Sequence, residues 1–285
     1  MKWINGNDDQ SNYEDRRGRR GKRLAGGGLI TIIIAIIAVF LGKDPDALFQ
    51  IADLFVPGQE AVSDDISGNE NEDLKVFSLR VFNSCNDVWT EIFDRELGKT
   101  YKKPTFVTFS GETMSGCGGA TAATGPFYCP ADEKVYIDLD FFHELANRFH
   151  APGDLAMAYV TAHEVGHHVQ HLLGTLDKLH SMRGHVSEAE YNRMSVKVEL
   201  QADFFAGLWA NYAQKMNIIA LEEGDLESAI RAAEAIGDDT LQKQSQGYVV
   251  PDAFTHGTSS QRMYWFKRGF ETGDFSAGDT FAELK

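Results

Sequence analysis

Residues 154–173 read DLAMAYVTAHEVGHHVQHLL, and they predict a helix that ends at Gly174. Within this helix His163 and His167 are four residues apart, so they share one face and both imidazoles can reach one metal ion. Glu164 lies beside that ion and is not itself a ligand. Gly166 lowers helix stability by ~1 kcal/mol, so we expect another chain segment or a substrate to approach closely there.

The same residues have a structural interpretation, in which two helix histidines pair with surface carboxylates. The neighbouring histidines do not complete a metal site. His171 lies eight residues from His163, which is about 12 Å along a helix axis, and His168 points to another face. We expect His168 and His171 to be surface or second-layer polar residues.

A catalytic zinc site needs three protein ligands and an open position for water, so a third donor must come from another element. Glu199 is the candidate, on a long helix predicted from Ser187 to about Gln214. Asp203 shares its face and can accept the free ring N–H of a ligating histidine, which sets the tautomer. A solvent-exposed acidic pair is disfavoured by the apolar neighbours Val198, Leu200, Phe204 and Phe205.

The rest of the chain is mostly helical with one small sheet. Asp73 and Gly98 delimit a predicted helix over 74–97, and further helices are predicted over 225–236 and 258–271. The expected strand is 105–109, residues 111–125 read as a loop, and 126–129 can form a hairpin with 134–138. The fold class is therefore α+β and predominantly helical.

An apolar segment near the N-terminus predicts membrane attachment. Residues 24–42 are uncharged, and these 19 residues give roughly the 30 Å needed to cross a bilayer. A buried core helix would not be apolar on all faces, and a cleaved signal peptide would carry an Ala-x-Ala site, which 39–43 does not offer. The cations that precede the segment favour a cytoplasmic N-terminus; they are Arg16, Arg17, Arg19, Arg20, Lys22 and Arg23.

The sequence thus divides into a basic cytoplasmic tail (1–23), a transmembrane helix (24–42), a stalk with an acidic linker (43–73) and one exported domain (74–285). The chain carries 27 basic and 42 acidic side chains, for a formal net charge of −15. An acidic body repels phosphate backbones, so we expect no nucleic-acid partner.

Three motifs carry a resemblance to a known family. They are AHEVGHHVQ at 162–170, ELQAD at 199–203 and HGTSSQR at 256–262. The first two resemble the gluzincin arrangement of zinc peptidases, and all three together resemble the bacterial "putative neutral zinc metallopeptidase" family. The resemblance covers nearly the whole chain. It implies a zincin-like metallopeptidase domain, a Zn²⁺ cofactor and a peptide or protein substrate. It also implies a single-pass protein of the bacterial inner membrane, with its catalytic domain periplasmic or otherwise extracytoplasmic.

The expected ligands are His163, His167 and Glu199, and the expected reaction is peptide-bond hydrolysis. Zinc lowers the pKa of water towards ~7, and Glu164 takes the water's proton and passes it to the leaving amine. His256 is the candidate for stabilising the anionic tetrahedral state, worth about 3 kcal/mol in comparable sites. The alternative is that His256 only caps or packs.

Two further residues or segments are candidates for shaping the cleft. Arg262 is expected to hold a carboxylate or to maintain the geometry of the cleft. The strand at 126–129 is the candidate sheet edge for the substrate's main chain.

The three cysteines leave room for one disulfide. Cys117 and Cys129 flank the loop rich in glycine, alanine and threonine, and a bridge between them would add ~2–3 kcal/mol in an oxidising compartment. We expect Cys85 to be a buried free thiol. A cysteine metal site is disfavoured because the chain has no C-x-x-C pair. A catalytic role for Cys117 with one of the histidines is also disfavoured, because lone Cys and His pairs are common by chance.

The rival hypothesis is a non-catalytic exported scaffold or adaptor that keeps a structural zinc site. A structural site closes its fourth position with a protein ligand, and no fourth ligand stands at a useful spacing. Glu164 serves chemistry and not coordination, which favours the enzyme.

Overall fold

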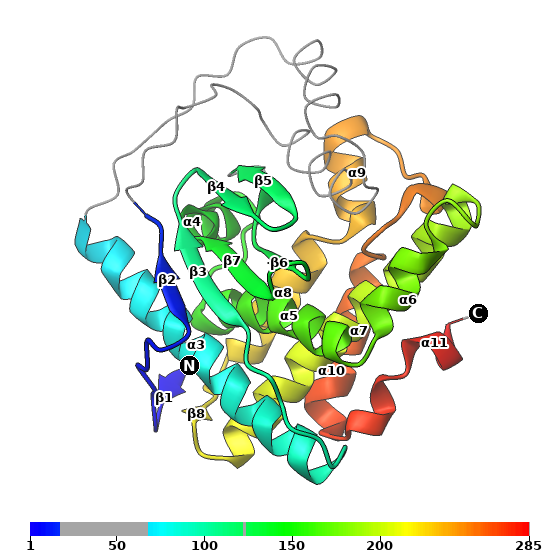
Figure 1. Cartoon of the computed structure of the whole chain (residues 1–285). Helices are drawn as coiled ribbons and strands as arrows, with labels where there is room; N and C mark the ends of the chain where they lie inside the picture. The colour runs from blue at the N-terminus through cyan, green and yellow to red at the C-terminus, as the bar shows by residue number, and fades with distance from the viewer. Residues whose placement is uncertain (18–67, 122–123, 285) are drawn as a thin grey trace.

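The structure is a computed structural model that describes residues 1–17, 68–121 and 124–284. It confirms the predicted mostly helical α+β class. Its helices are α3 (Gly68–Arg95), α4 (Asp140–Asn147), α5 (Asp154–Leu172), α6 (Thr175–Met182), α7 (Glu188–Lys215), α8 (Asp225–Ala235), α9 (Asp238–Gln246), α10 (Ser259–Thr272) and α11 (Thr280–Glu283), with 3-10 turns η2 (Pro251–Ala253) and η3 (Phe275–Gly278). Its strands are β1 (Lys2–Trp3), β2 (Tyr13–Asp15), β3 (Thr105–Phe109), β4 (Glu112–Ser115), β5 (Gly118–Thr121), β6 (Phe127–Cys129), β7 (Lys134–Asp138) and β8 (Ile219–Ala220) (Figure 1).

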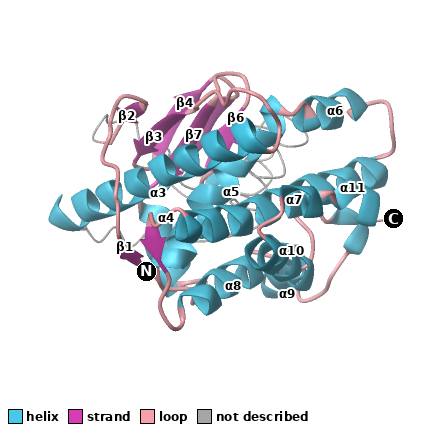
Figure 2. Ribbon diagram, turned by 90° about the horizontal axis from the view of Figure 1, so that it is seen from below, coloured by secondary structure: helices cyan, strands magenta, loops and turns pink. Residues whose placement is uncertain are grey.

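The largest sheet has the strand order β2-β3-β7-β6. β2, β3 and β7 are parallel, whereas β6 runs antiparallel to β7. Phe127 pairs with Tyr136 and Cys129 with Lys134, so the predicted hairpin is confirmed. Among the described strands β6 is an edge strand, which leaves one side of its backbone without a strand partner. Figure 2 shows this sheet on one side of α5, with α8 and α10 on the other.

α5 is the central helix of the fold. Its residues from Leu155 to Gln170 are all buried except Met157, because α3, α7, α8 and the sheet cover it on several sides. Gly174 follows its end with φ of 78°, a left-handed conformation that glycine adopts without steric cost. A Cβ on Gly166 would lie only 3.2 Å from the carbonyl oxygen of Ala202 on α7. Gly166 therefore allows the close approach that the sequence predicts.

Several local predictions differ from the structure. α3 begins at Gly68, so the last six residues of the expected linker (68–73) are helical. The expected loop 111–125 contains the hairpin β4–β5, whose residues are nearly all half-buried or exposed and show no alternating apolar pattern. The helices α4, α6 and α9 are additional to those predicted, and each has only eight or nine residues.

The N-terminal residues 1–17 belong to the folded domain, which corrects their assignment to a separate tail. β1 pairs antiparallel with β8, and β2 pairs parallel with β3. These strands have two and three residues, too few for an apolar pattern to be recognised.

The predicted transmembrane helix cannot be compared with the structure, because 24–42 lies outside the described residues. Within the described ranges, every helix is too short or too polar to cross a membrane.

A disulfide joins Cys117 to Cys129, the pair expected from the sequence. It ties the turn between β4 and β5 to the edge strand β6. Cys85 on α3 is a buried free thiol.

Candidate metal centre

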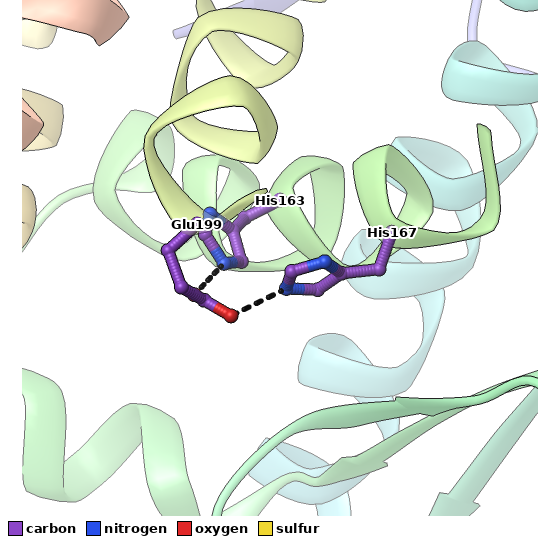
Figure 3. A group of neighbouring side chains, drawn as sticks. All are labelled: His163, His167 and Glu199. Atoms are coloured by element: carbon purple, nitrogen blue, oxygen red, sulfur yellow. Dashed lines mark hydrogen bonds and ion pairs between the residues drawn. The ribbon is translucent and has the colours of Figure 1, made fainter. Parts of the chain in front are cut away.

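Three side chains from two helices converge on one point. His163 and His167 come from α5 and Glu199 comes from α7, and one donor atom of each lies within 4.8 Å of the others. Figure 3 shows both imidazole rings pointing toward the Glu199 carboxylate. The Nε2 atom of His163 is 3.2 Å from Oε2 of Glu199, and Nε2 of His167 is 3.4 Å from Oε1. The structure thus brings together the three ligands expected from the sequence.

The chemistry of these donors fits a zinc ion. Two imidazole nitrogens and one carboxylate oxygen are a ligand set found in catalytic zinc sites. Oε1 of Glu199 is buried and has no hydrogen bond of good geometry, only the 3.4 Å contact with Nε2 of His167, although buried polar atoms are almost always well paired. A cation bound between the three residues would satisfy it.

The electrostatics of the cluster favour an ionised Glu199. Burial alone would raise the pKa of this carboxyl, but His167 and His163 hold it well below its usual range. The pKa of Asp203 is also lowered, because Arg262 and His163 outweigh the effect of burial. Burial lowers the pKa of His163, but the carboxylates of Asp203 and Glu199 more than offset this and raise it to about 10.

A charged network supports His163. Its Nδ1 donates to Oδ1 of Asp203 at 2.8 Å, which leaves Nε2 for the metal. Arg262 on α10 binds both oxygens of Asp203, at 2.8 and 2.9 Å, and Tyr159 donates its hydroxyl to Oδ1 at 2.5 Å. Arg262 therefore holds a carboxylate, one of the two roles expected for it, and Asp203 is completely buried.

A neutral network supports His167. Its Nδ1 lies 2.9 Å from Oε1 of Gln170, one turn along α5. The amide nitrogen of Gln170 in turn donates to the backbone oxygen of Val198 at 2.7 Å and to the side chain of Gln201 at 3.1 Å, both on α7. The Gln170 amide thus fixes the ring of His167 and links α5 to α7, the two helices that carry the candidate ligands.

Glu164 lines the same cavity as the three donors but is not one of them. Its side chain is buried, and burial raises the pKa of Glu164, while His167, His163 and the backbone N–H of Tyr128 act in the opposite direction. A carboxylate with a raised pKa beside a candidate metal site is suited to moving a proton.

His256 lies in the wall of the cavity, held by Asp238 at the start of α9. One carboxylate oxygen of Asp238 accepts the backbone N–H groups of Thr255, His256 and Gly257, at 2.8, 2.6 and 3.0 Å. The other oxygen lies 3.2 Å from Nδ1 of His256. Burial lowers the pKa of His256, but Asp238 more than offsets this, so the net shift is upward.

His168 is completely buried and is not part of the candidate ligand group, so of the two positions expected for it, surface or second layer, the surface position is wrong. Its Nε2 lies 2.6 Å from the backbone oxygen of Lys102, and its Nδ1 lies 3.0 Å from the hydroxyl of Tyr128 on β6. Burial lowers the pKa of His168 to about 4, so the ring is neutral. His168 thus connects α5 to the edge strand, while half-buried His171 lies 3.9 Å from Glu133.

The cluster opens into a cavity of about 340 Å³. The wall beside the cluster includes β6 and the segment leading into it. The rest of the wall is mostly apolar and includes Phe141, Phe149, Val160, Leu176, Ile236 and Leu241.

Sequence reasoning missed Tyr159, Gln170 and Asp238 as parts of the site. Tyr159 precedes His163 by four residues and Gln170 follows His167 by three, so helical periodicity could have identified both. Asp238 is separated from His256 by 18 residues, and no local pattern connects them.

The chain belongs to the family described as "Putative neutral zinc metallopeptidase", which it matches over residues 1–281. It is 45% identical over 293 aligned positions to "Uncharacterized protein YpfJ" of Escherichia coli strain K12, with 99% of each chain covered. It is 37% identical over 259 positions to "Uncharacterized protein Mb2605" of Mycobacterium bovis, covering 86% of this chain and 85% of the relative. No solved structure matches the chain significantly.

Proposed function

We propose that this protein is a zinc-dependent endopeptidase that hydrolyses peptide bonds in proteins or peptides of the cell envelope. The observation that carries the proposal is the position of Glu164. It lines the cavity beside the cluster of His163, His167 and Glu199 without joining it. A structural zinc site has no need of such a carboxylate, whereas hydrolysis needs a base beside the metal.

In the proposed mechanism, each residue either transfers the reacting proton or keeps a histidine ring in the protonation state that metal binding needs. Zinc, when bound, acts as a Lewis acid that lowers the pKa of water and polarises the substrate carbonyl. Glu164 takes a proton from the attacking water and passes it to the leaving amine nitrogen. Asp203 and Gln170 keep the Nδ1 proton on His163 and His167, so that Nε2 of each ring stays available to the metal.

His256 is the proposed stabiliser of the anionic tetrahedral state. Asp238 holds both its backbone and its Nδ1 atom, so the ring has a fixed orientation in the cavity wall. A preorganised donor of this kind is worth about 3 kcal/mol in comparable sites. Replacing His256 with alanine should therefore lower kcat by about 10²–10³-fold, and Asp238→Asn should lower it less because the imidazole remains.

The substrate's main chain is proposed to lie along β6. This edge strand borders the cavity, and the backbone of Tyr128 lies against Glu164. Added strands gain main-chain hydrogen bonds, and adjoining pockets select side chains. The apolar cavity wall suits a large apolar side chain next to the scissile bond.

The proposed place of action is the membrane, outside the cytoplasm. Two observations support this location. The Cys117–Cys129 disulfide is of a kind that persists in oxidising compartments, which supports a location outside the cytoplasm. The segment 24–42 is uncharged and largely apolar, which supports attachment to a membrane.

The test compares the purified protein with Glu164→Gln, using zinc analysis and a library of peptides rich in large apolar residues. We expect the variant to retain zinc while losing activity by about 10²–10⁴-fold, the usual contribution of general acid–base catalysis. Glu188→Gln, at an exposed position on α7, is the matched control and should behave as the wild type.

A second variant tests the ligand assignment. Glu199→Ala should strip the metal, and full zinc occupancy in this variant would show that the third ligand lies elsewhere. A wild-type protein that binds zinc but cleaves no peptide or protein would favour the rival scaffold hypothesis.

A further inference from the structure

Residues 1–17 form two contact regions with the rest of the fold, and the first is at β1. Lys2 and Trp3 pair with Ala220 and Ile219, and the N–H of Ile4 donates to the oxygen of Ile218 at 2.9 Å. The side chain of Trp3 packs edge-on against Phe77 of α3, with ring centroids 6.0 Å apart. This segment therefore joins two helical regions that are far apart in sequence.

The second contact region adds β2 to the main sheet. Tyr13, Glu14 and Asp15 pair in parallel with Phe106, Val107 and Thr108. The hydroxyl of Tyr13 lies 2.6 Å from Oγ1 of Thr108, which is completely buried. Without β2, the edge of β3 would expose unpaired backbone groups.

The link between β1 and β2 is also held by α3. The buried side chain of Asn83 donates to the backbone oxygens of Asn7 and Asp9, at 2.8 and 2.9 Å. Arg80 binds both carboxylate oxygens of Asp8, at 2.5 and 2.8 Å. Figure 1 shows this blue segment running beside the cyan helix α3 before it reaches the sheet. The contacts are thus distributed along the whole segment.

The basic residues at its end have partners in the same domain. Arg16 binds Glu14 and donates to the backbone oxygen of Met114 at 2.7 Å, and Arg17 binds Glu72 at 2.6 Å. Two of the six cations that favour a cytoplasmic N-terminus therefore act as structural partners. Their positions give no evidence for which side of a membrane they occupy.

We infer that residues 1–17 lie in the same compartment as the metal centre. An odd number of membrane crossings between Arg17 and Gly68 would place β2 and β3 on opposite sides of a bilayer, and their pairing could not form. A single crossing by 24–42 with a cytoplasmic N-terminus is thus incompatible with this fold. The inference rests on strand pairing and is independent of catalysis.

Cysteine labelling in intact cells tests the inference on the full chain. Gln10→Cys places a thiol in the exposed part of the N-terminal segment, and Ser276→Cys places one on the exposed surface of the catalytic domain. A maleimide that cannot cross the inner membrane is added to cells with a permeabilised outer membrane, and then to lysed cells. The wild type reports the background from buried Cys85.

We expect the two thiols to react together, either both before lysis or both only after it. Labelling of both thiols only after lysis would support the shared compartment and contradict the proposed extracytoplasmic location. The two proposals can therefore be tested independently of each other. A thiol at position 10 that reacts only after lysis, while that at position 276 reacts before it, would overturn the inference. The reverse pattern would overturn it as well.

A stability measurement gives a second readout. Tyr13→Phe and Thr108→Val each remove one hydroxyl of the contact between β2 and β3. If the segment is docked, the double variant should lower the midpoint of thermal unfolding by less than the sum of the two single shifts. Strictly additive shifts would show that the two side chains do not meet, which would contradict the inference.

Discussion

The two histidines of α5 that are proposed as metal ligands, His163 and His167, receive different kinds of support. His163 is backed by the carboxylate of Asp203, which is itself held by Arg262 and Tyr159. His167 is backed by the neutral amide of Gln170, which is held by backbone and amide groups of α7. Both arrangements fix the tautomer, but only the first requires buried charges to balance one another. The hydrogen-bond network behind His163 should therefore be more sensitive to mutation than the network behind His167.

The largest effect is expected for Arg262→Met. This change leaves the buried carboxylate of Asp203 without its cation, and breaking a buried ion pair in this way costs about 3–5 kcal/mol. Urea denaturation of the metal-free protein measures the loss. Arg268→Met on the same helix is the control, because it removes a more exposed pair with Glu283 worth about 0–1 kcal/mol. Similar losses for the two variants would contradict the view that the His163 support depends on buried charge.

Asp203→Asn should have the next largest effect, here on metal binding. The amide keeps the shape but removes the negative charge that faces His163. We expect zinc affinity to fall about 10–100-fold, the usual range for groups that orient a ligand. Competition with a zinc chelator measures the affinity. An unchanged affinity would mean that the orientation of His163 is set by packing alone.

Gln170→Leu tests the neutral network that supports His167. It removes the partner of Nδ1 of His167 but leaves no charge unbalanced, so we expect about a 10-fold loss of zinc affinity, at the low end of the same range. The same chelator competition applies. A loss larger than that of Asp203→Asn would reverse the proposed order of the two supports.

Tyr159→Phe should destabilise the protein less than Arg262→Met does. The hydroxyl is one of several donors to Asp203, and the bond is charge-assisted, so its removal should cost about 1.5–3 kcal/mol of stability. Two nitrogens of Arg262 remain in contact with the carboxylate, which favours the lower end. Urea denaturation beside Arg262→Met gives the comparison, and an equal loss in both variants would show that hydroxyl and guanidinium contribute alike.

The sequence predicted the parts of the site that follow helical spacing. His163, Glu164 and His167 lie within one helix, and Glu199 with Asp203 repeats the spacing on another, so a period of 3.6 residues identifies both groups. The contact of Asp238 with His256 depends on how α9 packs beside the loop before α10, which no local pattern encodes. The same limit applies to His168, whose role depends on β6 lying against its ring.

The fold was predictable where elements are long. The helices of 19 and 28 residues at α5 and α7 were found with nearly their full bounds. β1 and β2 could not be found, because their stability comes from partners 216–218 and 93 positions away, respectively, and not from their own apolar pattern. Short strands of this kind are defined by tertiary contacts, which local propensity does not report.

The pairing of residue 2 with residue 220 also constrains the time course of folding. A ribosome releases the N-terminal segment first, yet its partner on β8 emerges only after more than 200 further residues have been made. For contacts between such distant positions, the chain loses the entropy of closing a large loop before any stabilising contact forms, and this slows their formation. β1 would thus be among the last elements to dock, whereas β2 can pair with β3 once residue 108 has emerged.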